Sequence, residues 1–223
     1  MTETGWKTCE DPAAMLAHVC GVLSERKLRL FSCACCHRAW GAVTDERLGQ
    51  ALDALERYAD GNATEKQRIE AGRRSEAVRR EFYDAVGKEE EVCVACELSF
   101  AAAKTMRRVA RDCGQRAASA FAWADVGKFA DLQREERGAQ ASLLRDIVGD
   151  PFCPVPFPSA WRTEAAVGLA RRMYEARDFG AMPILADALE EAGCDDALLL
   201  EHCRGPGPHV RGCWVVDQVL GRE

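Results

Sequence analysis

Two pairs of cysteines in this chain have the spacing of metal-ligand motifs. Cys33 and Cys36 form one C-x-x-C pair, and Cys93 and Cys96 form a second about sixty residues later. Both pairs lie in segments with a helical pattern, where residues three apart face the same side. Two such helices could offer four thiolates to one ion, which suits tetrahedral Zn²⁺ and, less well here, Cu(I). The alternative is that these cysteines are small buried residues between helices.

A second group of potential ligands lies near the C-terminus. Cys194, His202, His209 and Cys213 fall within twenty residues, with Cys203 among them. Cys194, His202, His209 and Cys213 are candidate ligands of a metal ion, for which Zn²⁺ is the candidate. Their spacing matches no known finger or knuckle. The simpler interpretation, which we favour, is structural, with residues 205–208 forming a rigid Gly-Pro-Gly-Pro turn between two short helices.

The sequence signals for catalysis are weaker than those for metal binding. Cys33 and Cys36 could act as a redox dithiol, although they lie well inside a helix rather than at its N-terminus, where the pKa of a thiol is lowered. Residues 33–37 match the C-x-x-C-H pattern of haem attachment, but attachment requires export. No Ser-His-Asp set, glycine-rich phosphate loop or H-E-x-x-H motif occurs in the sequence. We therefore do not expect an enzyme, and we predict no catalytic residues.

The charge pattern does not favour nucleic acid or a membrane surface. The formal net charge is −6, so no chain-wide attraction to phosphate groups is expected. Arginines do gather at 73, 74, 79, 80, 107, 108, 111 and 116. Acidic residues are interspersed among them, which is typical of solvated helix faces. Nucleic acid and membranes are therefore not expected partners.

The polar N-terminus indicates the cellular compartment in which we expect the protein. Residues 1–12 are polar and lack the apolar core of a secretory signal, and no run reaches the eighteen or so apolar residues of a membrane span. We expect the cytoplasm, where thiols stay reduced. The twelve cysteines are then interpreted first as small buried hydrophobic residues and second as ligands or redox groups.

Helical periodicity with capping signals runs through the chain and predicts an all-α bundle of about nine or ten helices. Thr44 is the expected cap before the amphipathic stretch that ends at Gly61, and Thr64 with Gln67 is a capping box. The expected helices cover about 13–23, 25–40, 45–60, 65–86, 129–148, 164–174, 183–192, 197–202 and 210–220. The stretch 89–124 predicts either one long helix or two. No strand alternation appears.

Four prolines at 151, 154, 156 and 158 mark the best boundary in the chain, because each removes a backbone donor and restricts its predecessor. We expect a helical bundle over 1–149, a proline-rich linker over 150–159 and a small helical module over 160–223. The module is expected to pack on the bundle.

Two stretches carry a family resemblance. Residues 26–40 (RKLRLFSCACCHRAW) are one, and residues 183–194 (PILADALEEAGC) continuing through 202–217 (HCRGPGPHVRGCWVVD) are the other. They resemble an expanded family of uncharacterised proteins of planctomycete-type bacteria. The resemblance implies a bacterial cytoplasmic setting, but no activity or ligand set to carry over. Residues 183–193 also resemble a short module found beside repeat proteins, which favours interaction with another protein.

Three functions remain open. The leading hypothesis is a non-enzymatic helical scaffold or interaction protein with a protein partner. The first alternative is a cysteine-based metal-binding protein that uses either group of candidate ligands. The second alternative is a thiol redox protein.

Overall fold

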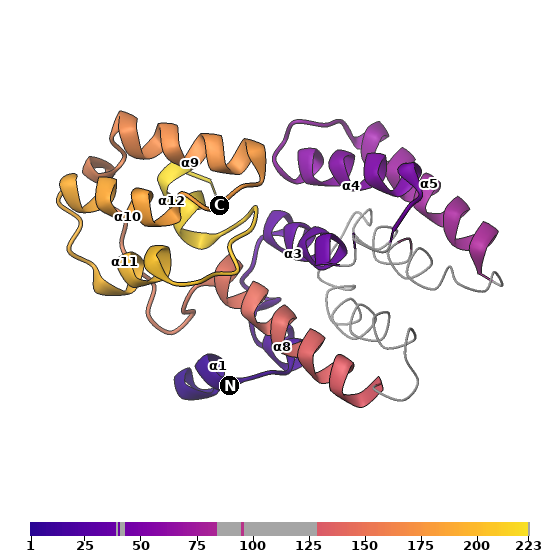
Figure 1. Cartoon of the computed structure of the whole chain (residues 1–223), viewed down its shortest axis with the longest axis horizontal. Helices are drawn as coiled ribbons and strands as arrows, with labels where there is room; N and C mark the ends of the chain where they lie inside the picture. The colour runs from indigo at the N-terminus through magenta and orange to yellow at the C-terminus, as the bar shows by residue number, and fades with distance from the viewer. Residues whose placement is uncertain (39, 41–42, 84–94, 96–128, 223) are drawn as a thin grey trace. The chain divides into compact units, whose positions relative to one another are not determined.

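The computed structural model describes residues 1–38, 40, 43–83, 95 and 129–222. Over these residues the chain is α-helical without strands, which confirms the predicted fold class. The described α-helices number ten (Figure 1): α1 (Glu3–Thr8), α2 (Pro12–Val19), α3 (Glu25–Arg38), α4 (Glu46–Ala59), α5 (Glu65–Phe82), α8 (Phe129–Val148), α9 (Glu164–Ala176), α10 (Met182–Glu191), α11 (Ala197–Arg204) and α12 (Trp214–Leu220). A short 3₁₀ helix, η3, covers Ser159–Trp161. Apart from Ala95, the expected helical stretch 89–124 lies outside the described residues.

Local capping explains why several helices begin where the sequence predicts. The capping box of α5 is present: the Gln67 amide donates to Thr64 Oγ1 at 3.3 Å, and the Thr64 amide donates to Gln67 Oε1 at 2.7 Å. Thr163 caps α9 and Asp196 caps α11 through the same kind of side-chain acceptor. Each such cap stabilises its helix by about 1 kcal/mol.

Other helix boundaries differ from the prediction. The cap of α4 is Asp45 rather than Thr44, because its carboxylate accepts the Arg47 amide at 2.8 Å. Helix α1 was not predicted, yet Thr2 caps it and Trp6 on it is only 1% exposed. Buried tertiary packing therefore stabilises a six-residue helix that is too short to be stable alone.

The final helix is also shorter than predicted. Helix α12 begins at Trp214, four residues after the expected start. The Val210 amide donates to the side chain of Asp146 instead of continuing a helix, and Gly212 has φ +93°, a left-handed conformation that helices exclude. The residues before α12 are thereby held as an irregular loop.

The described chain divides into two compact units, Met1–Leu144 and Arg145–Glu223, so the last turn of α8 belongs to the second. In the first unit, α4 packs along α5 and α3 packs against α4 (Figure 1). Their buried side chains form one apolar cluster, in which the described members include Cys33, Cys36, Leu48, Leu52, Leu55, Ala71 and Val78. The predicted apolar face of α4 is therefore part of the core.

In the second unit, α10 packs against both α9 and α11, and α12 packs against α9 and α11 (Figure 1). Sixteen buried residues form the core of this unit. The proline-rich segment packs on that core through Val155 and Phe157, and Gln218 Nε2 donates to the Val155 carbonyl at 3.2 Å. Residues 150–159 are therefore part of the second unit.

Among the helices that the structure describes, none is both long enough and apolar enough to cross a bilayer.

Candidate metal centre

Four side chains from separate segments of the second unit meet at one place. Asp146 comes from the last turn of α8, His202 from the last turn of α11, His209 from the loop before α12, and Cys213 from the N-cap of α12. One potential ligand atom from each lies within 4.8 Å of the others. Carboxylate, imidazole and thiolate are all ligands of transition-metal ions. Among the residues that the structure describes, no other group of three or more such ligands was found.

Asp146 contacts both histidines of this group. Its Oδ1 lies 2.9 Å from His209 Nδ1 and 3.2 Å from His202 Nε2, and its Oδ2 accepts the Val210 amide at 2.9 Å. The residue is only 2% exposed. Burial alone would raise the pKa of Asp146, but hydrogen bonds from His202 and His209 outweigh it and keep that pKa below the ordinary value. A buried negative charge therefore stands at the centre of the group.

Cys213 supplies the sulfur. Its Sγ lies 3.3 Å from His202 Nε2, and the residue is fully buried. Burial, and then the nearby charge of Asp146, raise the pKa of Cys213 well above that of a free thiol. In the absence of an ion this sulfur is therefore protonated, and a bound metal ion would displace its proton.

His209 and His202 pack edge to face, with ring centroids 4.9 Å apart. The side chain of His209 is 8% exposed, and its Nε2 is buried with no hydrogen-bond partner among the described residues. Buried polar atoms are normally paired, so the protein groups shown here do not fully satisfy this cluster. His202 is the most accessible member, with 20% of its side chain exposed.

The closest pairs of ligand atoms are spaced almost as in a tetrahedral site. Around Zn²⁺, bonds of about 2.0–2.3 Å place neighbouring ligand atoms about 3.3–3.6 Å apart. Three of the six pairs here are separated by 2.9, 3.2 and 3.3 Å, and all four atoms lie within 4.8 Å of one another. An ion would therefore have to spread the closest atoms by a few tenths of an ångström and draw the more distant ones together.

A Cys-His-Asp catalytic triad is a poor description of the same residues. In a triad, the carboxylate and the nucleophile bind opposite nitrogens of the histidine ring. Here Asp146 Oδ1 and Cys213 Sγ both approach Nε2 of His202. The thiol is also fully buried with a raised pKa, which is the reverse of an activated nucleophile.

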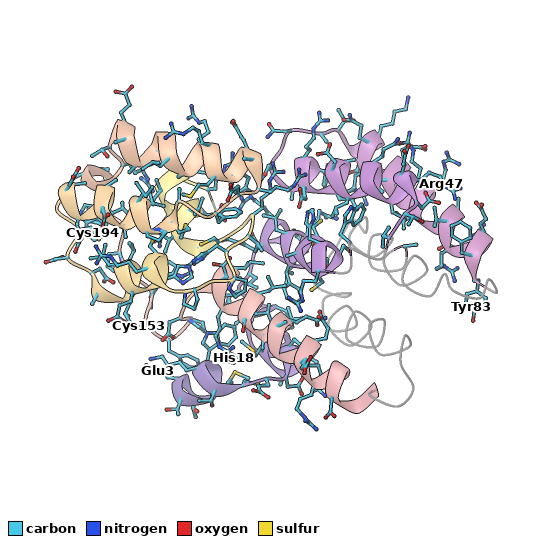
Figure 2. The ribbon with its side chains drawn as sticks, viewed as in Figure 1. Glu3, His18, Arg47, Tyr83, Cys153 and Cys194 are labelled. Carbon is cyan, nitrogen blue, oxygen red and sulfur yellow. The ribbon has the colours of Figure 1, made fainter. Side chains whose placement is uncertain are left out.

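The structure brings together three of the four C-terminal residues that the sequence singled out: His202, His209 and Cys213. Cys194 is not in the group. It follows the left-handed Gly193 after α10, where Figure 2 labels it, and its side chain is 4% exposed in the core that also holds Cys203. Burial raises the pKa of Cys194 and raises that of Cys203 to about 12, so both are neutral core thiols.

Asp146 was missed by the sequence reasoning. It lies between Leu143 and Ile147, which are both buried, on the inward stripe of α8. A carboxylate at an inward helical position is rarely buried without a partner, and this was the available signal. The residue that it would pair with was not identifiable, because the other ligands lie more than fifty positions later.

The first candidate site is described only in part. Cys33 and Cys36 lie in α3 with 0% and 2% exposure and belong to the core of the first unit. Cys93 and Cys96 lie outside the described residues. The four-cysteine site therefore stays a prediction, as does the redox hypothesis, whose two thiols are buried in this structure.

The arginines of α5 are engaged along their own helix. Arg73 and Arg74 bind Glu70, and Arg79 and Arg80 bind Glu76. Hydrogen bonds from Arg73 and then Arg74 lower the pKa of Glu70 to about 2. These contacts are those of the solvated face that the interspersed acids predict.

Comparison with models of known protein families, with curated proteins and with solved structures finds no match to this chain.

Proposed function

We propose that the second unit binds one Zn²⁺ ion through Asp146, His202, His209 and Cys213. The observation that carries the proposal is the convergence of four potential ligand atoms, from three helices and a loop, within 4.8 Å in a largely buried position. Imidazole, carboxylate and thiolate are each among the ligands that zinc accepts.

The chemistry of the ligands favours zinc over other common ions. Ca²⁺ and Mg²⁺ prefer shells made of oxygen, and only Asp146 offers oxygen here. Cu(I) is favoured by several sulfur ligands, and only Cys213 offers sulfur. With neutral histidines, the Asp146 carboxylate and a Cys213 thiolate together carry two negative charges, which balance the ion.

The proposed role of the ion is structural. Four protein ligands complete a tetrahedral shell, whereas a catalytic zinc keeps one position for water or substrate. The ion would join the end of α8 to α11, to the following loop and to the start of α12. It would therefore stabilise the arrangement of the segments that carry the ligands.

A hydrogen-bonded network without an ion is the competing explanation, because Asp146 has donors for both of its oxygens. The two explanations differ in metal content. Protein purified without added metal should contain one equivalent of zinc by elemental analysis, and added Co²⁺ should give the absorption of a thiolate-bound tetrahedral ion. A chain with no bound metal and no Co²⁺ absorption would contradict the proposal.

Substitutions of the proposed ligands test whether the ion binds at these residues. Cys213→Ala and His209→Ala should lose the zinc. Cys203→Ala is the matched control, because Cys203 is a fully buried cysteine of the same core that lies outside the group of ligands. If Cys203→Ala loses zinc as completely as Cys213→Ala, the loss reflects damage to the core and the assignment fails.

The scaffold hypothesis stays a proposal for the chain as a whole, and a structural ion is compatible with it. The resemblance of residues 183–193, which include most of α10, to a module found beside repeat proteins supports it. Affinity purification of this chain from an extract of the cells that produce it should recover a stable protein partner. Repeated failure to recover one would count against this role.

A further inference from the structure

The indole of Trp214 stands beside the proposed metal centre and belongs to none of its ligands. Trp214 is the first residue of α12 and directly follows Cys213. Its ring lies 5.2 Å from the ring of His202, centroid to centroid, with the two planes inclined at 53°. It is partly buried against the core of the second unit.

A second neighbour of the indole is Gly149, which directly follows α8. A Cβ atom built on Gly149 would lie 3.1 Å from Cγ and from Cδ2 of Trp214, which is too close for a side chain without movement of the ring. Gly149 also has φ +74°, and its amide donates to the Arg145 carbonyl at 2.9 Å to close the helix. The backbone at the end of α8 is therefore in close contact with the indole.

His202 needs such support more than the other ligands do. Its Nε2 faces Asp146 Oδ1 at 3.2 Å and Cys213 Sγ at 3.3 Å, so the ring must keep one direction. It lies in the last turn of α11 and is the most exposed of the four ligands. The terminal torsion of a histidine is broad by itself, so a packed neighbour must restrict it.

We propose that Trp214 is a positioning residue of the metal centre: it lies between Gly149 and His202 and holds the His202 ring with Nε2 toward the ion. This inference rests on the proposed zinc site. Groups outside the ligand shell that orient ligating histidines typically change metal affinity about 10- to 100-fold when they are replaced. Trp214 also directly follows Cys213 in the chain. Packing of its indole on Gly149 therefore helps to place Cys213 relative to Asp146.

The test compares Trp214 with a tryptophan of the same unit that does not touch the site. Trp161 packs on the same core and against Phe157, with ring centroids 5.3 Å apart. Zinc affinity and the Co²⁺ absorption spectrum are measured on the full chain for Trp214→Leu, Trp214→Phe and Trp161→Leu. Circular dichroism establishes that each variant is folded.

Trp214→Leu should bind zinc about 10- to 100-fold more weakly than the wild type and should show an altered Co²⁺ spectrum. Trp214→Phe should recover part of the loss, and Trp161→Leu should keep wild-type affinity even if its melting temperature falls. Wild-type affinity and spectrum in Trp214→Leu would overturn the inference. If Trp214→Leu does not fold, Trp214→Phe decides, with at least about threefold weaker binding expected and unchanged binding overturning it.

The two proposals fail in different ways. A wild-type chain that binds no zinc would overturn the zinc site and this inference together. A wild-type chain that binds zinc, with unchanged affinity in the Trp214 variants, would overturn the inference alone.

Discussion

Removal of zinc should destabilise the second unit without unfolding it completely. That unit has its own core of sixteen buried residues, and all of them except Cys213 lie outside the proposed ligand set. Asp146 also keeps its hydrogen bonds to His209 and to the Val210 amide in the absence of metal. We therefore expect a metal-free second unit that stays folded but is less stable than the zinc-bound form, unlike a zinc finger that unfolds without metal.

The size of the effect follows from mass action. At a free zinc concentration one hundred times the dissociation constant, binding adds about 2.7 kcal/mol to the free energy of unfolding. The second unit spans about 80 residues, and in domains of that size 1 kcal/mol corresponds to about 4–8 °C. Chelation should therefore lower the melting temperature of this unit by about 10–20 °C.

Hydrogen exchange followed by mass spectrometry, together with thermal denaturation, can measure this change for each unit. After chelation and dialysis, amides of α11, the following loop and α12 should exchange faster, and added zinc should restore their protection. Peptides from α4 and α5 are the internal control, since those helices belong to the first unit. An unchanged melting temperature with unchanged exchange in α11 and α12 would refute the structural role of the ion.

Three further changes test other parts of the structure. Asp146→Asn keeps the shape of the side chain but removes its charge, so zinc affinity should fall by at least the loss of about 10- to 100-fold that is typical for groups outside the ligand shell, and unchanged affinity by competition titration would argue against a ligand role. Thr64→Ala should lower the free energy of unfolding of the first unit by about 1 kcal/mol in urea, because it removes the capping box of α5, and no change would show that the cap is dispensable. Leu55→Ala should lower that free energy by about 2–5 kcal/mol, because Leu55 is fully buried, and a change below about 1 kcal/mol would contradict its place in the core.

The elements that the sequence predicts best are those with local signals. The side chains of Thr64, Thr163 and Asp196 each bind an amide three residues away, so the sequence alone shows where these helices begin. The start of α12 differs because the Val210 amide binds a carboxylate from α8. That contact is tertiary and has no local signature.

The candidate site divides in the same way. His202, His209 and Cys213 are close in the sequence, and this closeness, with their residue types, was enough to single them out. Asp146 comes from a distant helix, and only the fold brings it to them. Cys194 lies only eight positions before His202 in the sequence, but its side chain packs into the core after α10. Its position in the sequence does not show that the side chain points into the core.

X-ray absorption at the zinc edge of the purified wild-type chain tests the central claim most directly. The ligand set proposed here predicts one sulfur at about 2.3 Å and three nitrogen or oxygen ligands at about 2.0–2.2 Å. A shell of four sulfur atoms would instead indicate the cysteines at positions 33, 36, 93 and 96. A shell without sulfur, or a chain without zinc, would contradict the site formed by Asp146, His202, His209 and Cys213.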